Sequence, residues 1–96
     1  MIVNWTDNAI EHLVGIYGYV GLNSPSYARK VVDRITRRSE QLAAFPLSGR
    51  IVPEYALKGI REIIEGSYRI IYHVKRNQID VIAVVHGAQP LPPLDG

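Results

Sequence analysis

Three side chains in the second half of the chain could do chemistry, and each also has a structural explanation. Arg69 could bind a phosphate or a partner carboxylate, or it could form a cross-strand ion pair with Glu62. His86 could be a general acid or base, because histidine titrates near neutral pH. Since no nucleophile or metal partner accompanies His86, a structural role at the end of its strand is favoured. Glu54 could act as a base if its loop packs beside Arg69, which sequence spacing leaves open.

The composition excludes several classes of site. The 96 residues include no cysteine, which removes disulfides and thiolate metal sites and fits a reducing cytoplasm. No H-E-x-x-H motif, phosphate-binding loop or Ser-His-Asp order is present, so no metal and no cofactor are expected. No signal peptide is visible, and the longest apolar run is too short to span a bilayer. The net charge of +2 permits an acidic partner, either protein or nucleic acid.

The pattern predicts one domain over residues 1–96, because a single core is usual at this length. Thr6 and Ser24-Pro25 are start signals for two helices, and the short loop between them favours an antiparallel helical hairpin. Pro46 is expected to stop the second helix. Gly66-Ser67 is typical of a tight type II′ turn between two strands. The expected elements are a strand at 1–5, helices at 7–20 and 25–45, strands at 60–65, 68–75 and 78–86, and an extended tail at 88–96. A further short strand at 50–52 is left open.

These elements predict an α+β fold in the order β-α-α-β-β-β, with the helical hairpin on one face of a small, mainly antiparallel sheet. Hairpins closed at Gly66-Ser67 and Arg76-Asn77 decide which side chains share a face. The face suited to helix packing carries Ile63, Tyr68, Ile70, Tyr72, Val81, Ala83 and Val85. The opposite face mixes aliphatic and charged residues, namely Ile60, Glu62, Ile64, Arg69, Ile71, His73, Asp80, Ile82, Val84 and His86.

This second face is too apolar to stay bare without a reason. Exposed apolar patches with polar rims often mark partner sites, so we expect another polypeptide to bind there. The expected contact residues are Arg61, Glu62, Arg69, Ile71, His73, Ile82, Val84 and His86.

A row of basic residues follows the second predicted helix, namely Arg29, Lys30, Arg34, Arg37 and Arg38. Such a row could contact nucleic acid. A solvated helix face is the commoner explanation, and Asp33 and Glu40 interrupt the row.

Several segments, taken in order, resemble the RelE/ParE toxin superfamily over nearly the whole chain, and the ParE branch most closely. They are Trp5-Thr6, Leu42-Ala43-Ala44-Phe45-Pro46 with Gly49-Arg50, Ile60-Arg61-Glu62, Tyr68-Arg69-Ile70-Ile71-Tyr72 and the strand-end His86. The resemblance implies a cytoplasmic toxin of a type II toxin–antitoxin pair, the kind of system associated with plasmid stabilization. Its partner would be a cognate antitoxin that wraps the toxin in a hetero-oligomer. The ParE branch is associated with poisoning DNA gyrase, so a binding toxin without a cofactor is expected.

The RelE-like branch, which cuts mRNA on the ribosome, is the alternative. In that case the catalytic site would consist of Glu54, Arg69 and His86. Together these side chains would activate the ribose 2′-hydroxyl, stabilise the phosphorane and protonate the leaving oxygen. No Tyr follows His86, and Gln89 stands where related toxins often carry a basic residue. A third interpretation is a non-toxic binding module that has kept the fold.

Overall fold

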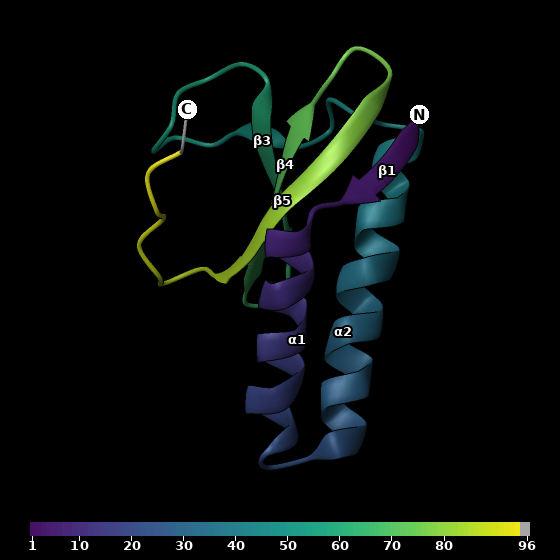
Figure 1. The fold of residues 1–96 in the computed structure, drawn as a ribbon, viewed down its shortest axis with the longest axis vertical. Helices are drawn as coiled ribbons and strands as arrows, with labels where there is room; N and C mark the ends of the chain where they lie inside the picture. The colour runs from purple at the N-terminus through teal and green to yellow at the C-terminus, as the bar shows by residue number, and fades with distance from the viewer. Residues whose placement is uncertain (95–96) are drawn as a thin grey trace.

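The computed structural model describes residues 1–94 and shows an α+β fold in which a pair of helices accompanies a five-stranded sheet (Figure 1). The strand order is β1-β5-β4-β3-β2; β1 is parallel to β5 and the other neighbours are antiparallel. The predicted order of elements is confirmed, with the short β2 as an added edge. The elements are β1 (Ile2–Trp5), α1 (Asp7–Gly21), α2 (Pro25–Glu40), a 3₁₀ turn (Gln41–Ala43), β2 (Arg50–Ile51), β3 (Ile60–Glu65), β4 (Tyr68–Val74) and β5 (Gln78–His86).

Both helices start where the sequence predicts. The Thr6 hydroxyl accepts a hydrogen bond from the Ala9 amide, and the Ser24 hydroxyl accepts one from the Tyr27 amide. Each bond satisfies an amide that has no partner inside its helix. Pro25 occupies the first helical turn of α2, where its missing N–H costs nothing.

The end of α2 differs from the prediction. The α-helix stops at Glu40, and the chain tightens into the 3₁₀ turn instead of continuing to Phe45. A proline disfavours helical geometry at the residue before it, so Pro46 acts on Phe45 as well as on itself. Phe45 is therefore 66% exposed and lies outside the buried stripe of the helix.

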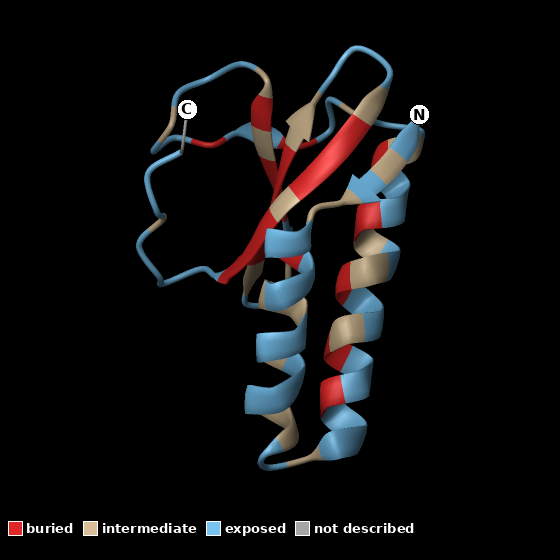
Figure 2. Cartoon of the chain, in the orientation of Figure 1, coloured by how far each residue is buried: buried red, intermediate tan, exposed pale blue. Residues whose placement is uncertain are grey.

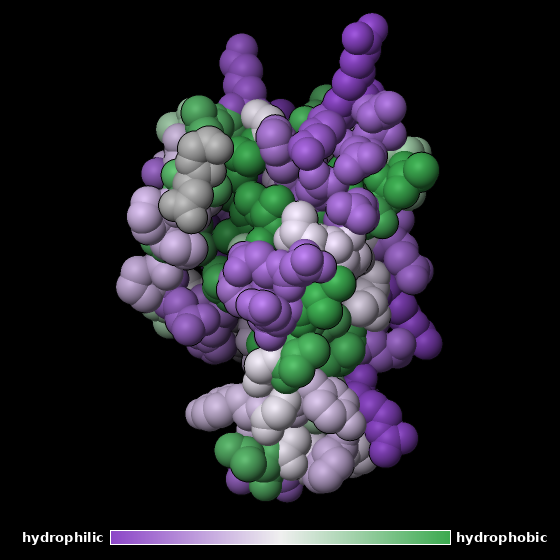
Figure 3. Space-filling model, viewed as in Figure 1, coloured by the Kyte–Doolittle hydropathy of each residue, from purple (hydrophilic) through white to green (hydrophobic). Residues whose placement is uncertain are grey.

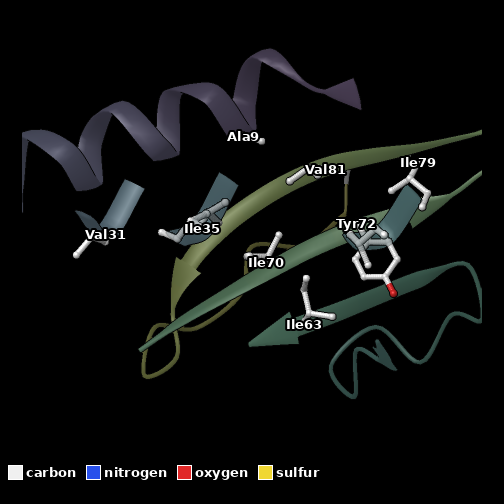
Figure 4. Close-up of a cluster of buried hydrophobic side chains, with 10 residues drawn as sticks. Ala9, Val31, Ile35, Ile63, Ile70, Tyr72, Ile79 and Val81 are labelled. Atoms are coloured by element: carbon white, nitrogen blue, oxygen red, sulfur yellow. The ribbon is translucent and has the colours of Figure 1, made fainter. Parts of the chain in front are cut away.

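The main core lies between the helical hairpin and one face of the sheet (Figures 2 and 4). In Figure 4, Ile35 of α2 lies next to Ile70 of β4, and Val31 lies at the edge of the same cluster. Burying one large aliphatic side chain contributes about 1.5–3 kcal/mol, so this layer holds the helices on the sheet. Its buried members are Ala9, Val31, Ile35, Leu42, Ile63, Ile70, Tyr72, Ile79, Val81 and Val84.

A β-bulge in β5 changes the predicted faces. Tyr72 pairs with Val81 as predicted, but Ile71 pairs with Ala83, so Ile82 is an extra residue without a partner in β4. From Ala83 onward every side chain of β5 lies on the face opposite to the predicted one, because strand side chains alternate. Val84 therefore joins the helix-side core, and Ala83 and Val85 move to the second face.

The second face is covered by the chain itself, so the expectation of a bare docking face is wrong. Its core consists of Val52, Ile60, Ile71, Ala83 and Val85, with Tyr55, Ile82 and Leu91 packed against it. The covering segments are the loop over residues 52–57 and the tail over residues 88–94, and the Tyr55 hydroxyl donates to the Pro92 carbonyl. Residues 88–94 of the predicted extended tail form neither helix nor strand and begin in a turn, and residues 95–96 lie outside the described part.

Gly49 sits where no side chain fits. Its amide donates to the Tyr72 hydroxyl at 2.9 Å, and its carbonyl accepts from Arg61 Nη1 at 2.9 Å. A Cβ atom at this position would lie 2.4 Å from the Glu62 carbonyl oxygen and 2.5 Å from the Tyr72 hydroxyl. The strand β2 can approach β3 closely only because this residue is glycine.

We expect Gly49→Ala to lower the free energy of unfolding by about 2 kcal/mol or more, because the clash forces β2 away from β3. Gly18→Ala is the matched control, because a Cβ atom at Gly18 in α1 would meet no other atom within 4 Å. That change should stabilise the protein by about 0.5–1 kcal/mol. Denaturant unfolding of both variants measures the difference, and similar effects would contradict the packing argument.

Candidate functional site

Arg69 is the centre of an ion network formed by the buried Arg69 and Glu62 and the more exposed Arg50 and Glu54. Arg69 is 7% exposed and Glu62 is 1% exposed. Arg69 donates to Glu62 from Nε at 2.5 Å and from Nη2 at 2.8 Å. It also donates to Glu54 from Nη1 at 2.6 Å and from Nη2 at 2.9 Å. Arg50 Nε lies 3.2 Å from the second Glu62 oxygen.

Three parts of the fold assemble this network. The β3–β4 register places Ile71 opposite Glu62 and Ile64 opposite Arg69, so Glu62 and Arg69 are diagonal neighbours on the second face. Arg50 lies directly opposite Glu62 on β2. Glu54 comes from the turn that begins at Val52, which is tied to β3 because the Val52 amide donates to the Ile60 carbonyl. The network therefore joins the covering loop to the sheet.

Both bidentate contacts fix the charges of the network. The Arg69 guanidinium lowers the pKa of the Glu54 carboxyl to about 2, mainly through their hydrogen bonds. The two carboxylates in turn raise the pKa of Arg69 above its usual range, Glu54 first and Glu62 second. A carboxylate with so low a pKa is a poor proton acceptor at neutral pH. Arg69 has its donors committed to carboxylates, so it has little capacity left for a phosphate.

His86 lies on the other side of the sheet from this network. It pairs with Tyr68 in the ladder, and the two rings meet edge to face with centroids 5.8 Å apart. Its Nδ1 accepts from the Ala88 amide at 3.2 Å, and its own amide donates to Gln89 Oε1 at 3.0 Å. His86 thus anchors the start of the tail. The structure brings Glu54 and Arg69 together but leaves His86 apart from them, because the bulge at Ile82 shifts the strand by one residue.

The residues expected to bind a partner do not form one accessible surface. Glu62, Arg69, Ile71 and Val84 are buried, and Val84 belongs to the helix-side core. These four side chains are buried in the chain as it stands, and their contact with a partner stays a prediction. Three others are half-buried and one is exposed, namely Arg61, His73, Ile82 and His86.

An open groove remains on the second face, between the covering loop and the tail (Figure 3). Its floor is apolar and includes Ile60, Ile71 and Ala83. His73 and Ile82 line it, so two of the expected contact residues are accessible from this groove. Asp80 lies opposite His73 in the β4–β5 ladder, and its carboxylate bonds to Lys75 Nζ at 2.6 Å.

Sequence reasoning missed the role of two α1 side chains. Where β1 ends, β5 has a free edge, and α1 supplies partners for it. His12 Nδ1 accepts from the Val84 amide at 3.1 Å, and Asn8 Nδ2 donates to the Ile82 carbonyl at 2.9 Å. Their spacing of four residues puts both on one side of the helix, which was the available signal. This contact requires His12 with an unprotonated Nδ1.

Within residues 1–94, no group of three or more His, Cys, Asp or Glu side chains is placed to hold a metal ion. The same part of the chain contains no helix long and apolar enough to cross a membrane.

We expect Arg69→Met to lower the free energy of unfolding by about 3 kcal/mol or more, because it leaves the buried Glu62 carboxylate without its main partner. Arg37→Met is the matched control, since Arg37 forms an exposed pair with Asp33 at 3.2 Å. The control should cost no more than about 0.5 kcal/mol. Denaturant unfolding separates the two cases, and a small effect of Arg69→Met would show that the network contributes little.

Stability should fall in acid partly through Glu54. Its folded pKa of about 2 is below its usual 4.5, so the carboxylate stabilises the fold above pH 4.5 and loses this contribution as the pH falls toward 2. In Glu54→Gln the contribution is missing at every pH. The stability difference between the wild type and Glu54→Gln should therefore be largest near neutrality and shrink on acidification, as followed by denaturant unfolding at several pH values. Glu65→Gln, which removes no ion pair from the described residues, should show no such convergence.

Comparison with known proteins agrees with this architecture. The family described as the ParE toxin of type II toxin–antitoxin system, parDE, matches residues 3–91. The Sinorhizobium fredii protein Y4kP is 32% identical over 92 residues, which cover 94% of this chain and 92% of that protein. Toxin RelE2 of Caulobacter vibrioides is 30% identical over 88 residues, covering 91% of this chain and 96% of the relative. A solved structure of the chromosomal ParDE TA system from P. aeruginosa superposes with a TM-score of 0.74 and 26% identity, covering 90% of this chain and 95% of that one. The chain therefore belongs to the ParE family of toxins of type II toxin–antitoxin systems.

Proposed function

We propose that this protein arrests growth by binding DNA gyrase and poisoning it, and that a cognate antitoxin neutralises it. Membership of the ParE family supports a toxin with an antitoxin partner. The choice of gyrase rests on the resemblance to the ParE branch and on one structural observation. Glu54 and Arg69 are locked together on one face of the sheet, and His86 lies on the other. A toxin built this way acts by binding, in the cytoplasm where gyrase works on DNA.

The ribonuclease alternative draws support from a relative that carries the name toxin RelE2. RNA cleavage would need a base, a cation and an acid around one phosphate, within hydrogen-bond reach of the reacting atoms. Here the acid candidate is separated from the other two by the sheet, and the base candidate has a pKa of about 2. The geometry therefore favours the gyrase hypothesis over mRNA cleavage.

The groove on the second face is our proposed contact for the antitoxin. A solved relative is described as a ParDE TA system, which associates a protein of this fold with such a partner. The groove offers an apolar floor with His73 and Ile82 accessible, and exposed apolar grooves are typical docking sites. Pro92, Pro93 and Leu94 of the tail line this groove, so an antitoxin segment that binds deeply would displace part of the tail.

Purified protein should inhibit supercoiling by gyrase and should trap DNA in the cleaved state, while ribosome-bound mRNA stays intact. Added antitoxin should restore supercoiling. A gel assay on relaxed plasmid measures both effects, and a ribosome-dependent cleavage assay on mRNA runs in parallel.

His86→Ala is the variant that discriminates between the two activities. The His86 side chain is exposed, so this variant should fold, whereas loss of Arg69 removes the buried network and confuses activity with stability. mRNA cleavage by the wild type that is lost in folded His86→Ala would overturn the gyrase proposal in favour of the nuclease. Expression without growth arrest would favour a non-toxic binding module.

A further inference from the structure

Charge is unevenly distributed between the two helices. The helix α2 contains five basic and two acidic residues, so its net charge of +3 exceeds the +2 of the whole chain. The helix α1 contains Asp7 and Glu11 and no Lys or Arg. The positive character of the protein is therefore concentrated on one helix of the hairpin.

Three of the basic residues in α2 are free to bind something else. Arg37 is paired with Asp33, and Arg38 donates to Gln41 Oε1 at 2.6 Å. Arg29, Lys30 and Arg34 form no ion pair or side-chain hydrogen bond with any residue between 1 and 94. We call these three residues the basic face of α2.

The basic face spreads over the outer side of α2, because five residues separate Arg29 from Arg34, which is about 140° around the axis at about 3.6 residues per turn. Its residues are exposed and lie opposite the buried side of α2 at Val31 and Ile35. Arg29 and Arg34 are separated by roughly 7.5 Å along the axis, at about 1.5 Å per residue. Two phosphates of one DNA strand that are two steps apart differ by a similar rise along the duplex axis, at about 3.4 Å per step. The helix extends past the sheet (Figure 1), and hydrophilic side chains follow the outer edge of the hairpin (Figure 3).

The surroundings of the basic face resemble a nucleic-acid surface more than a protein surface. No large hydrophobic residue between Ala28 and Ala44 is exposed. Protein interfaces have an apolar core, whereas DNA interfaces are polar and strongly positive. Arg and Lys are among the side chains that most often bind phosphate oxygens of DNA.

We propose that the basic face of α2 binds the phosphate backbone of duplex DNA without reading its sequence. This site rests on the proposed function, because a toxin bound to gyrase sits beside the DNA that gyrase holds. Arg29 and Arg34 supply planar guanidinium groups that can bind phosphate oxygens in pairs, and Lys30 adds a point charge. The site supplies extra affinity for the gyrase–DNA complex over gyrase alone.

The test compares two double variants that each remove two positive charges. Arg29→Gln with Arg34→Gln alters the basic face, and Lys58→Gln with Arg76→Gln removes exposed cations elsewhere. Fluorescence anisotropy with a labelled duplex, recorded from low to moderate salt, gives the binding constant of the whole protein. Three phosphate contacts predict a slope of about −2.7 in log K against log salt, at about −0.9 per contact. The basic-face variant should show a slope of about −0.9 and at least tenfold weaker binding at low salt, and the control should stay within about twofold of the wild type.

Each contrary result has a definite meaning. Equal losses in the two variants would overturn the proposal, because net charge alone would then explain the attraction. No salt-dependent binding by the wild type would also overturn it, because the protein would then make no phosphate contacts. Weaker binding of the basic-face variant to gyrase without DNA would also overturn it, because the face would then bind an acidic protein surface. Binding to DNA with the predicted slope, by a protein that leaves gyrase unaffected, would refute the gyrase function and keep the site. Circular dichroism confirms that both variants fold.

Discussion

The bulge at Ile82 determines which side chains share a face of the sheet, and therefore which candidate catalytic groups can lie together. Without the bulge, alternation would place His86 on the same face as Arg69, and the three residues of a nuclease-like set would share one surface. With it, Val84 enters the helix-side core and His86 meets Tyr68. The bulge lies beside the free edge of β5, where Asn8 and His12 of α1 bond to backbone groups of Ile82 and Val84. An edge satisfied by side chains is closed to a further strand, so α1 protects the sheet while it fixes the altered register.

The ion network is the second constraint on the structure, and its main effect is on the position of the covering loop. Burying Glu62 and Arg69 carries a desolvation cost that only good geometry offsets. Four short hydrogen bonds from Arg69 to two carboxylates supply that geometry. Since Glu54 belongs to the covering loop, the network also holds this loop over the apolar second face. Stability and the shape of the groove are therefore coupled through one guanidinium group.

Local signals in the sequence were sufficient for much of the fold. The hydroxyl caps at Thr6 and Ser24, the turn at Gly66 and the diagonal of Glu62 and Arg69 follow from rules that span only a few residues. The bulge could not be predicted in this way, because Val81 to Val85 is an unbroken aliphatic run in which either face accepts every residue. The packing of the loop and the tail over the second face was not predicted for a related reason. Neither segment has a periodic apolar pattern, so the sequence does not indicate which surface it packs against. The structure corrects the site accordingly, from an open face to a groove.

The fold also decides which charges remain available to a partner. Near the sheet, three carboxylates form ion pairs within the molecule. Glu54 and Glu62 bind Arg69, and Asp80 binds Lys75. On α2 the cations outnumber the carboxylates, and Asp33, the acid nearest to Arg29, Lys30 and Arg34, is paired with Arg37. A net charge of +2 therefore understates the positive charge of α2, which carries +3, because Asp7 and Glu11 of α1 contribute −2 to the total. A toxin of this design separates its two surfaces, with an apolar groove formed by the sheet and a cationic helix that points away from it.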